Sequence, residues 1–171
     1  VDLVGLLVDT VADARAAGPE HDWQLDLAVL EPPAGATAEE AEDFLPEPPL
    51  VIGDEARLRQ VVVNLLANAR VHTPAGSHVT TTLAREGDTL IVRIHDDGPG
   101  IAPDVRDRLF ERFARGDSSR ERRTGSTGLG MSIALAIVQS HGGSIDVDSS
   151  TASEDHGTTF TVRLPAAVVE E

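Results

Sequence analysis

Cysteine and lysine are both absent from this chain of 171 residues, and each absence excludes a class of site. Without cysteine there is no disulfide framework, no zinc–thiolate centre and no cysteine nucleophile. Without lysine there is no ordinary P-loop, because that loop ends in Gly-Lys-Ser/Thr. Long apolar runs are also missing: residues 133–138 form the longest, which is far too short to cross a bilayer, and Arg93 interrupts the run in residues 90–94.

Positive charge is scarce, with 14 basic residues, all of them arginine, against 29 acidic ones and a formal net charge of −15. Nucleic-acid binding is therefore not expected, since attraction to a phosphate backbone needs clustered cations. Half of the arginines crowd into one stretch: Arg106, Arg108, Arg112, Arg115, Arg120, Arg122 and Arg123. That cluster predicts an anionic ligand, although a solvated helix face is the alternative.

The remaining composition, 40% apolar and 25% charged, is typical of one globular domain over residues 1–171. No signal peptide opens the chain, and we expect Val1 to follow a cut inside a longer protein.

Hydrophobic periodicity predicts an α+β fold. Apolar residues at helical spacing indicate helices over 3–17, 54–70 and 129–140, and alternation indicates strands over 23–30, 79–84, 89–95, 144–148 and 158–164. The last two strands follow each other without a helix between them, which favours a mixed sheet with helices on one face. Residues 31–49 are rich in Pro, Ala and Glu, and we expect them to form a mobile acidic loop with a short helical turn over 38–44.

Three polar segments could carry chemistry. Residues 96–100 (DDGPG) directly follow a strand, and residues 125–130 (GSTGLG) lead into a helix, whose first backbone amides form a ready phosphate site. Asn64 and Asn68 are four residues apart and share one helix face, where a neutral oxygen could bind Mg²⁺. Each segment alone is weak, because glycine turns and surface asparagines are common.

The order of these segments resembles the ATP-binding domain of bacterial sensor histidine kinases, in the superfamily of gyrase, Hsp90 and MutL. Residues 64–73 (NLLANARVHT) resemble its N box, 96–101 (DDGPGI) the G1 box, 109–113 (LFERF) the F box and 125–131 (GSTGLGM) the G2 box. The resemblance implies a Bergerat-type α+β two-layer sandwich: a mixed sheet of about five strands, three main helices on one face, and a mobile ATP lid over 102–126.

The resemblance also implies a base and metal site. Asp96 would accept a hydrogen bond from the adenine amino group, while Gly98, Gly100 and Ile101 line the base. Asn68 would be the Mg²⁺ ligand. Asn64 stands where ATP-hydrolysing members carry a glutamate that activates water, and an amide cannot act as that base. Phosphoryl transfer to a histidine is therefore expected rather than hydrolysis.

The phosphate-binding residues are where this chain departs from the family pattern. The family has Lys or Arg three residues after the metal-binding Asn, where this chain has Val71, so Arg70 and His72 are both candidates. Arg115 and Arg120 match lid positions that reach the γ-phosphate, and with Asn64 they form the expected catalytic set. Phe110 and Phe113 would anchor the lid. The remaining expected ATP contacts are Thr127, Gly128, Leu129 and Gly130.

The family's phosphoacceptor histidine box is absent from the sequence. We therefore expect a monomeric domain that binds Mg²⁺ and ATP but does not autophosphorylate alone. The resemblance implies a homodimeric, membrane-anchored bacterial parent with this domain in the cytoplasm. Its partners would be its own dimerisation domain, which carries the histidine, and a response regulator of a two-component system.

Two other functions stay open beside this one. An anti-sigma-factor serine kinase has a similar nucleotide site, but the F box at 109–113 argues against it. A non-catalytic nucleotide-binding module is conceivable because of Val71, although Asp96, Asn68 and the glycines speak against it.

Overall fold

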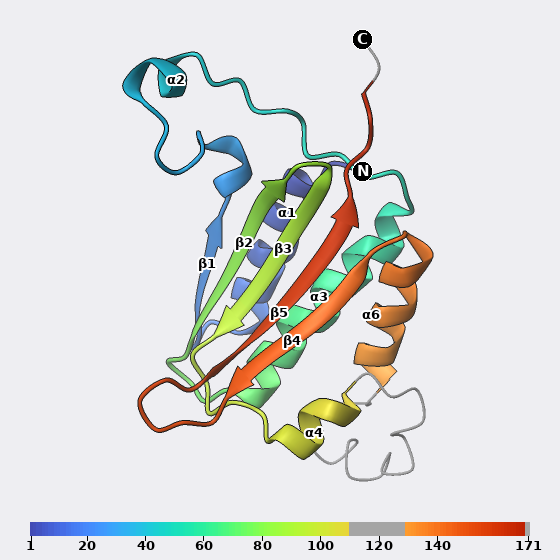
Figure 1. Cartoon of the computed structure of the whole chain (residues 1–171). Coiled ribbons are helices and arrows are strands. Elements are labelled where there is room, and N and C mark those ends of the chain that lie inside the picture. Colours follow the sequence, from blue (N-terminus) through green and yellow to red (C-terminus); the bar gives the residue numbers. More distant parts are fainter. Residues whose placement is uncertain (110–128, 170–171) are drawn as a thin grey trace.

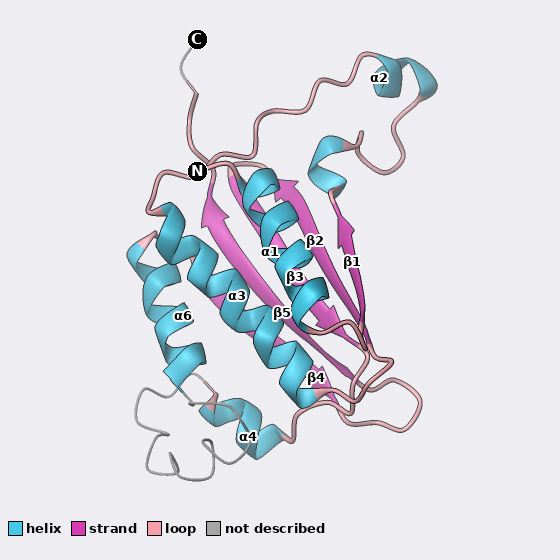
Figure 2. Cartoon of the chain, turned by 180° about the vertical axis from the view of Figure 1, so that it is seen from behind, coloured by secondary structure: helices cyan, strands magenta, loops and turns pink. Residues whose placement is uncertain are grey.

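The computed structural model describes residues 1–109 and 129–169, and these form two layers. One layer is a five-stranded sheet in the order β1-β2-β3-β5-β4. Helices α1, α3 and α6 all cover the same face of that sheet, as the two opposite views show (Figures 1 and 2). The predicted α+β sandwich, with a mixed sheet of five strands and three main helices on one face, is confirmed.

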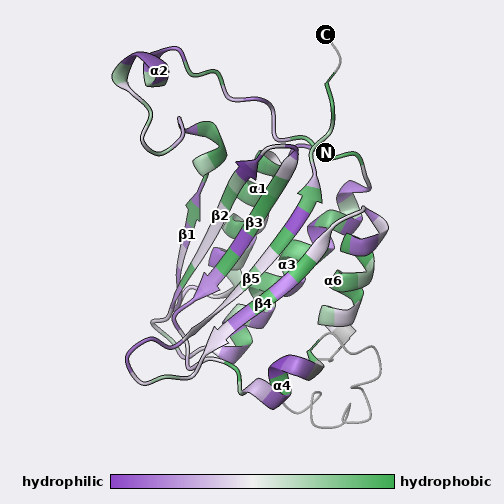
Figure 3. Cartoon of the chain, in the orientation of Figure 1, coloured by the Kyte–Doolittle hydropathy of each residue, from purple (hydrophilic) through white to green (hydrophobic). Residues whose placement is uncertain are grey.

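The sheet combines one parallel pair with three antiparallel pairs. Strand β1 (Asp22–Asp26) runs parallel to β2 (His78–Glu86), which forms a hairpin with β3 (Thr89–Asp96). Strand β5 (Gly157–Pro165) lies between β3 and β4 (Ser144–Ser150), antiparallel to both. Hydrophobic and hydrophilic residues alternate along β5, as expected for a sheet with one buried face (Figure 3).

The prediction of one strand over 23–30 is wrong beyond Asp26. The chain leaves the sheet at Leu27 and forms a short 3₁₀ helix, η1 (Ala28–Leu30). Val29 is buried there, so it keeps the alternating apolar pattern although it no longer belongs to a strand.

The three main helices have clear end signals. Asp2 caps α1 (Leu3–Ala17), which ends at Gly18, and Asp54 caps α3 (Glu55–His72). Helix α6 (Leu129–Ser140) ends in a Schellman motif: Gly142 has φ +76°, and the Gly143 N–H donates to the Val138 carbonyl at 2.9 Å. The apolar faces of these helices pack on the inner sheet face. The largest fully buried side chains there are Leu6, Leu7, Leu65, Leu66, Leu83, Leu90, Ile94 and Phe160.

Two short helices lie at opposite ends of the molecule (Figure 1). The predicted turn in the acidic loop is present as α2 (Ala38–Glu42), closed by a capping box from Thr37 and without a buried residue. At the other end, α4 (Pro103–Arg108) begins the segment expected to form the lid. Among the described residues, no helix is both long and apolar enough to cross a membrane.

Candidate functional site

The end of β3 brings a buried carboxylate next to the end of α3. Asp96 is the last residue of β3 and is only 6% exposed. Burial raises the pKa of its carboxyl group above the ordinary value of 3.8. Desolvation lowers the pKa of His72, the last residue of α3, and the negative charge of Asp96 acts in the opposite direction. The structure thus places side chains of the predicted N and G1 boxes within electrostatic reach of each other.

The loop after Asp96 needs its glycines. Its first turn closes when the Gly98 N–H donates to Asp96 Oδ1 at 3.0 Å. Gly100 has φ +83°, and a Cβ there would collide with the carbonyl oxygen of Ser150. The loop ends where the Ile101 N–H donates to Ser149 Oγ at 2.7 Å. Gly98 and Gly100 therefore stand where the backbone passes close to its protein neighbours, whereas their predicted approach to an adenine base stays a prediction.

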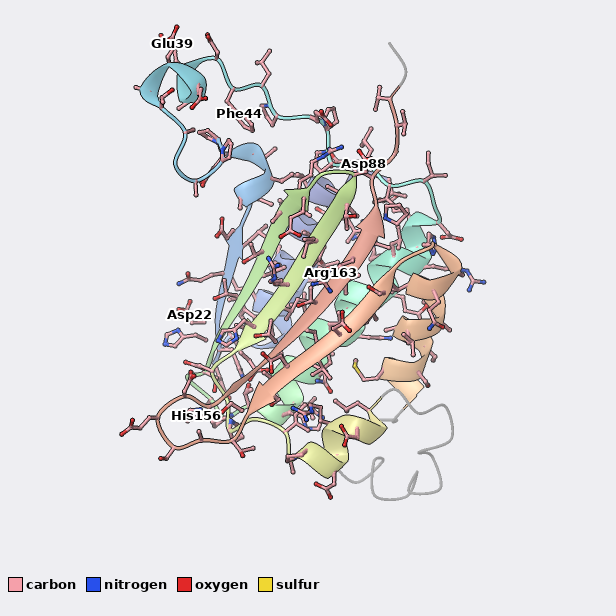
Figure 4. All side chains as sticks on the ribbon, in the orientation of Figure 1. Asp22, Glu39, Phe44, Asp88, His156 and Arg163 are labelled. Atoms are coloured by element: carbon pink, nitrogen blue, oxygen red, sulfur yellow. The ribbon has the colours of Figure 1, made fainter. Side chains whose placement is uncertain are left out.

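The connection between β4 and β5 holds the same loop from its other side. His156 Nδ1 donates to the Gly98 carbonyl at 2.6 Å. Ser149 Oγ, besides accepting from the loop, donates to the Gly157 carbonyl at 3.0 Å and contacts Thr158 Oγ1 at 2.8 Å. Figure 4 shows His156 at the end of the sheet where β3 ends. No role was predicted for His156 or Ser149, since nothing in the sequence marks a contact between a side chain and a backbone group 58 residues apart.

Asn64 and Asn68 lie on one face of α3, both partly buried, as predicted. Asn64 Nδ2 donates to the Gly130 carbonyl at 3.2 Å, in the first turn of α6. The N box is thereby joined to the last glycine of the G2 box. This contact of the Asn64 amide was not predicted from the sequence.

Arg70 and His72, the two candidates for the basic residue that is missing at Val71, have different surroundings, and which of them contacts a phosphate stays a prediction. Arg70 Cδ lies only 2.6 Å from the place of a Cβ on Gly18, so its aliphatic chain covers the cap of α1. His72, by contrast, lies within reach of the Asp96 charge. Neighbours on a helix point about 100° apart, which explains why Arg70 and His72 have different surroundings.

The other expected residues divide between the described and undescribed parts of the chain. Ile101 is partly buried against the core, and Met131 of the G2 box is buried. The expected contacts Arg115, Arg120, Thr127 and Gly128, and the lid anchors Phe110 and Phe113, lie outside the described residues. Leu129 and Gly130 form the first residues of α6.

Two supporting residues behind the site were not predicted. Thr73, which ends α3, is 9% exposed and touches Gly98, and His21 contacts Thr73 from 52 residues earlier in the chain. Thr73 lay within the recognised N box without an assigned role, whereas no pattern singled out His21.

Comparison with known proteins agrees with this geometry. Residues 53–168 match the family described as Histidine kinase-, DNA gyrase B-, and HSP90-like ATPase. The chain belongs to this family. Two relatives with high coverage of this chain are sensor histidine kinases, so within the family the chain is an ATP-binding domain of the sensor histidine kinase type.

Two relatives from Mycobacterium tuberculosis align with nearly the whole chain. The probable sensor histidine kinase TcrY is 48% identical over 165 residues, which are 96% of this chain and 30% of TcrY. The sensor histidine kinase TrcS is 38% identical over 170 residues, again 96% of this chain and 29% of TrcS. The chain thus spans about 30% of the length of these relatives.

Two solved structures of histidine kinases have a similar fold. The mycobacterial sensor histidine kinase MprB is 27% identical, with a TM-score of 0.75 over 99% of this chain and 97% of the MprB chain. Full-length ShkA in complex with AMPPNP is also 27% identical, with a TM-score of 0.70 over all of this chain and 31% of the ShkA chain.

Proposed function

We propose that this domain binds Mg²⁺ and ATP where α3 meets the end of β3, and that it phosphorylates a histidine on a separate dimerisation domain. In that step the bond between the γ-phosphorus and the bridging oxygen breaks, a bond to a histidine nitrogen forms, and ADP leaves. A response-regulator aspartate would then take the phosphoryl group. The observation that carries the proposal is the buried Asp96 at the junction of the N and G1 boxes.

Asp96 is suited to reading adenine. One oxygen already accepts the Gly98 N–H, and burial raises the pKa of the group because its charged form is poorly solvated. The adenine amino group would donate a hydrogen bond to this carboxylate, whereas guanine carries an acceptor at the equivalent position. The complex of the similar ShkA with AMPPNP supports an adenine nucleotide.

Asn68 is the proposed Mg²⁺ ligand. Its amide oxygen is a hard neutral donor, on the same helix face as Asn64 and one turn before His72. The described residues contain no cluster of three or more His, Asp or Glu side chains that could enclose a metal ion. This fits Mg²⁺, which binds few protein groups and completes its shell with phosphate oxygens and water. When bound, the ion would neutralise charge on the transferring phosphoryl group.

The neutral amide of Asn64 suits transfer rather than hydrolysis. Asn64 cannot accept a proton from water, and its amide is already engaged with the Gly130 carbonyl. Desolvation lowers the pKa of His72, and its ring would donate a hydrogen bond to a phosphate or ribose oxygen of the nucleotide. Positive charge at the γ-phosphate would come from Arg115 and Arg120.

The phosphoacceptor would come from outside the chain. We place the domain on the cytoplasmic side of a membrane-anchored, homodimeric sensor, with its dimerisation domain and a response regulator as partners. About 70% of TcrY and of TrcS lies outside the region aligned with this chain, which is ample length for a dimerisation domain and a membrane anchor in those relatives.

The test is a transfer assay with γ-labelled ATP and Mg²⁺. The domain alone should stay unlabelled. Addition of a matching dimerisation domain in trans should label that domain with an acid-labile, alkali-stable phosphate, the signature of phosphohistidine. An acid-stable phosphoester on a serine would contradict the proposal, as would steady ATP hydrolysis by the domain alone.

A further inference from the structure

Thr73 closes α3 with a hydroxyl whose hydrogen bonds define its orientation. Its Oγ1 donates to the Ala69 carbonyl at 2.6 Å. A hydroxyl has one proton, so in the 2.8 Å contact between Thr73 Oγ1 and His21 Nε2 the imidazole must be the donor. The same Nε2–H also points at the Thr73 carbonyl, at 3.3 Å. Two partners thus hold this side chain in one rotamer.

His21 reaches Thr73 from the segment before β1. Backbone hydrogen bonds flank it: the Gly76 N–H donates to the Glu20 carbonyl at 2.7 Å, and the Asp22 N–H to the Ser77 carbonyl at 2.9 Å. Its ring lies beside Trp23, with the ring centroids 5.7 Å apart. His21 Nδ1 is buried and has no hydrogen-bond partner within the part of the chain that the structure describes. Burying an unpaired acceptor is unfavourable, so it offsets part of the stability that the Nε2–H contacts with Thr73 contribute.

Thr73 in turn supports the loop that follows Asp96. Its methyl carbon Cγ2 would lie 2.5 Å from a Cβ on Gly98, so the methyl group packs directly on the Gly98 backbone. Gly98 then donates its N–H to Asp96 Oδ1 at 3.0 Å. A continuous set of contacts therefore runs from His21 through Thr73 and Gly98 to the buried carboxylate.

We propose that His21 and Thr73 are positioning residues that orient Asp96 for the amino group of adenine; this rests on the proposed function of the same site. With Gly98 fixed by the Thr73 methyl, one carboxylate oxygen is held by the loop and the other is left for the base. His21 lies outside the matched family residues 53–168, so the N-terminal part of this chain contributes to nucleotide selection.

The experiment measures the dissociation constants of Mg-ATP and of Mg-purine riboside triphosphate, which lacks the 6-amino group. Their ratio isolates the contact with the amino group, because a general loss of structure would weaken both nucleotides alike. We expect Thr73→Val, which keeps the shape but loses the hydroxyl, and His21→Leu each to reduce the preference for ATP by about tenfold, the worth of one good hydrogen bond.

Further variants keep the test decisive. His21→Gln, which retains an N–H donor at similar reach, should restore the preference, and Thr73→Ser, which loses only the methyl, should lower it. Because His21 acts through Thr73, the double variant His21→Leu/Thr73→Val should behave as Thr73→Val alone. If one variant fails to fold, the remaining variants decide through the same ratio. The matched control is Thr159→Val, which removes the hydroxyl from another His–Thr pair, His95 and Thr159, also 2.8 Å apart.

The outcomes separate this inference from the proposed function. If the unaltered domain binds neither nucleotide, the proposed function fails. If it prefers ATP and the preference survives in Thr73→Val and His21→Leu, or if the two substitutions have additive effects, only the positioning role is overturned.

Discussion

The two ends of α3 differ in how completely their polar groups are bonded. At the N-terminal end, Asp54 Oδ1 accepts the Arg57 N–H at 3.1 Å. His141, just after α6, receives the Asp54 N–H on Nε2 at 3.1 Å and donates from Nδ1 to the Ile137 carbonyl at 2.7 Å. Gly53 lies flat against the same ring, where a Cβ would collide with it. These contacts fasten α3 to the end of α6.

At the C-terminal end, polar groups are brought together without being fully bonded. Asp96 is buried with a raised pKa, and His72 beside it has a lowered one, so desolvation disfavours the charged form of each. Groups in this state are typical of sites that a ligand completes. The first turn of α3 thus contributes to stability, whereas its last turns belong to the candidate site. Substitutions at the two ends should separate these roles.

The largest effect on stability is expected for Gly53→Ala. The new methyl group would displace the His141 ring and break its bond to the Asp54 N–H. Overpacking together with a lost hydrogen bond should cost about 2 kcal/mol of unfolding free energy. Urea denaturation measures this loss, and the Mg-ATP affinity of the folded fraction should not change. A tenfold loss of Mg-ATP affinity with unchanged stability would contradict the separate roles of the two ends of α3.

Asn68→Ala should show the reverse behaviour at the other end. We expect Mg-ATP affinity to fall about tenfold, or about 1.4 kcal/mol, while the denaturation midpoint stays close to that of the unaltered domain. Titrations with and without Mg²⁺ check the cause, because the substitution should matter little without the ion. An equal loss in EDTA would show that Asn68 does not act through the metal.

Asp54→Ala should have a smaller effect than Gly53→Ala. It removes the N-terminal cap of α3, and such caps are worth about 1 kcal/mol. Thermal unfolding should show the lower stability with no change in nucleotide affinity. Asp54→Ser, which can cap the helix again, should recover most of the loss; failure to recover it would assign the effect to something other than the cap.

The smallest expected effect is a pH dependence due to Asp96. Because burial raises the pKa of its carboxyl group in the folded state, the group favours folding most when it is protonated. That contribution is fully present below about pH 4, near the unfolded-state pKa, and is lost as the pH rises through the raised folded value. The unfolding free energy of the unaltered domain, minus that of Asp96→Asn, should therefore fall between acidic and neutral pH. A difference that rises with pH would contradict this sign.

Much of the fold followed from local patterns in the sequence. Asp54 and Gly142 stand at helix ends that their residue types predict, and the hairpin of β2 and β3 turns at Gly87 with φ +57°. The strand predicted over 23–30 was wrong beyond Asp26, because a single 3₁₀ turn buries Val29 at a spacing that imitates a strand.

The site was predictable where one segment carries the signal. Asp96, Gly98 and Gly100 lie within five residues of one another, and the structure confirms the tight loop that they form. His156 reaches that loop, and His21 reaches Thr73 next to it, from distant segments, and no short pattern encodes such contacts. That the aliphatic chain of Arg70 covers Gly18 at the end of α1 depended on how α3 packs against α1, which the sequence pattern does not show.

The most direct test of the account is a calorimetric titration of Mg-ATP into the domain and into Asp96→Asn. The substitution keeps the size of the side chain and its acceptor for the Gly98 N–H, but it replaces the carboxylate. We expect clear binding by the unaltered domain and at least about a hundredfold weaker binding by the variant, which removes a charged hydrogen bond of about 3 kcal/mol. Equal affinity of the two proteins, or no binding by the unaltered domain, would contradict the assignment of Asp96 as the residue that reads adenine.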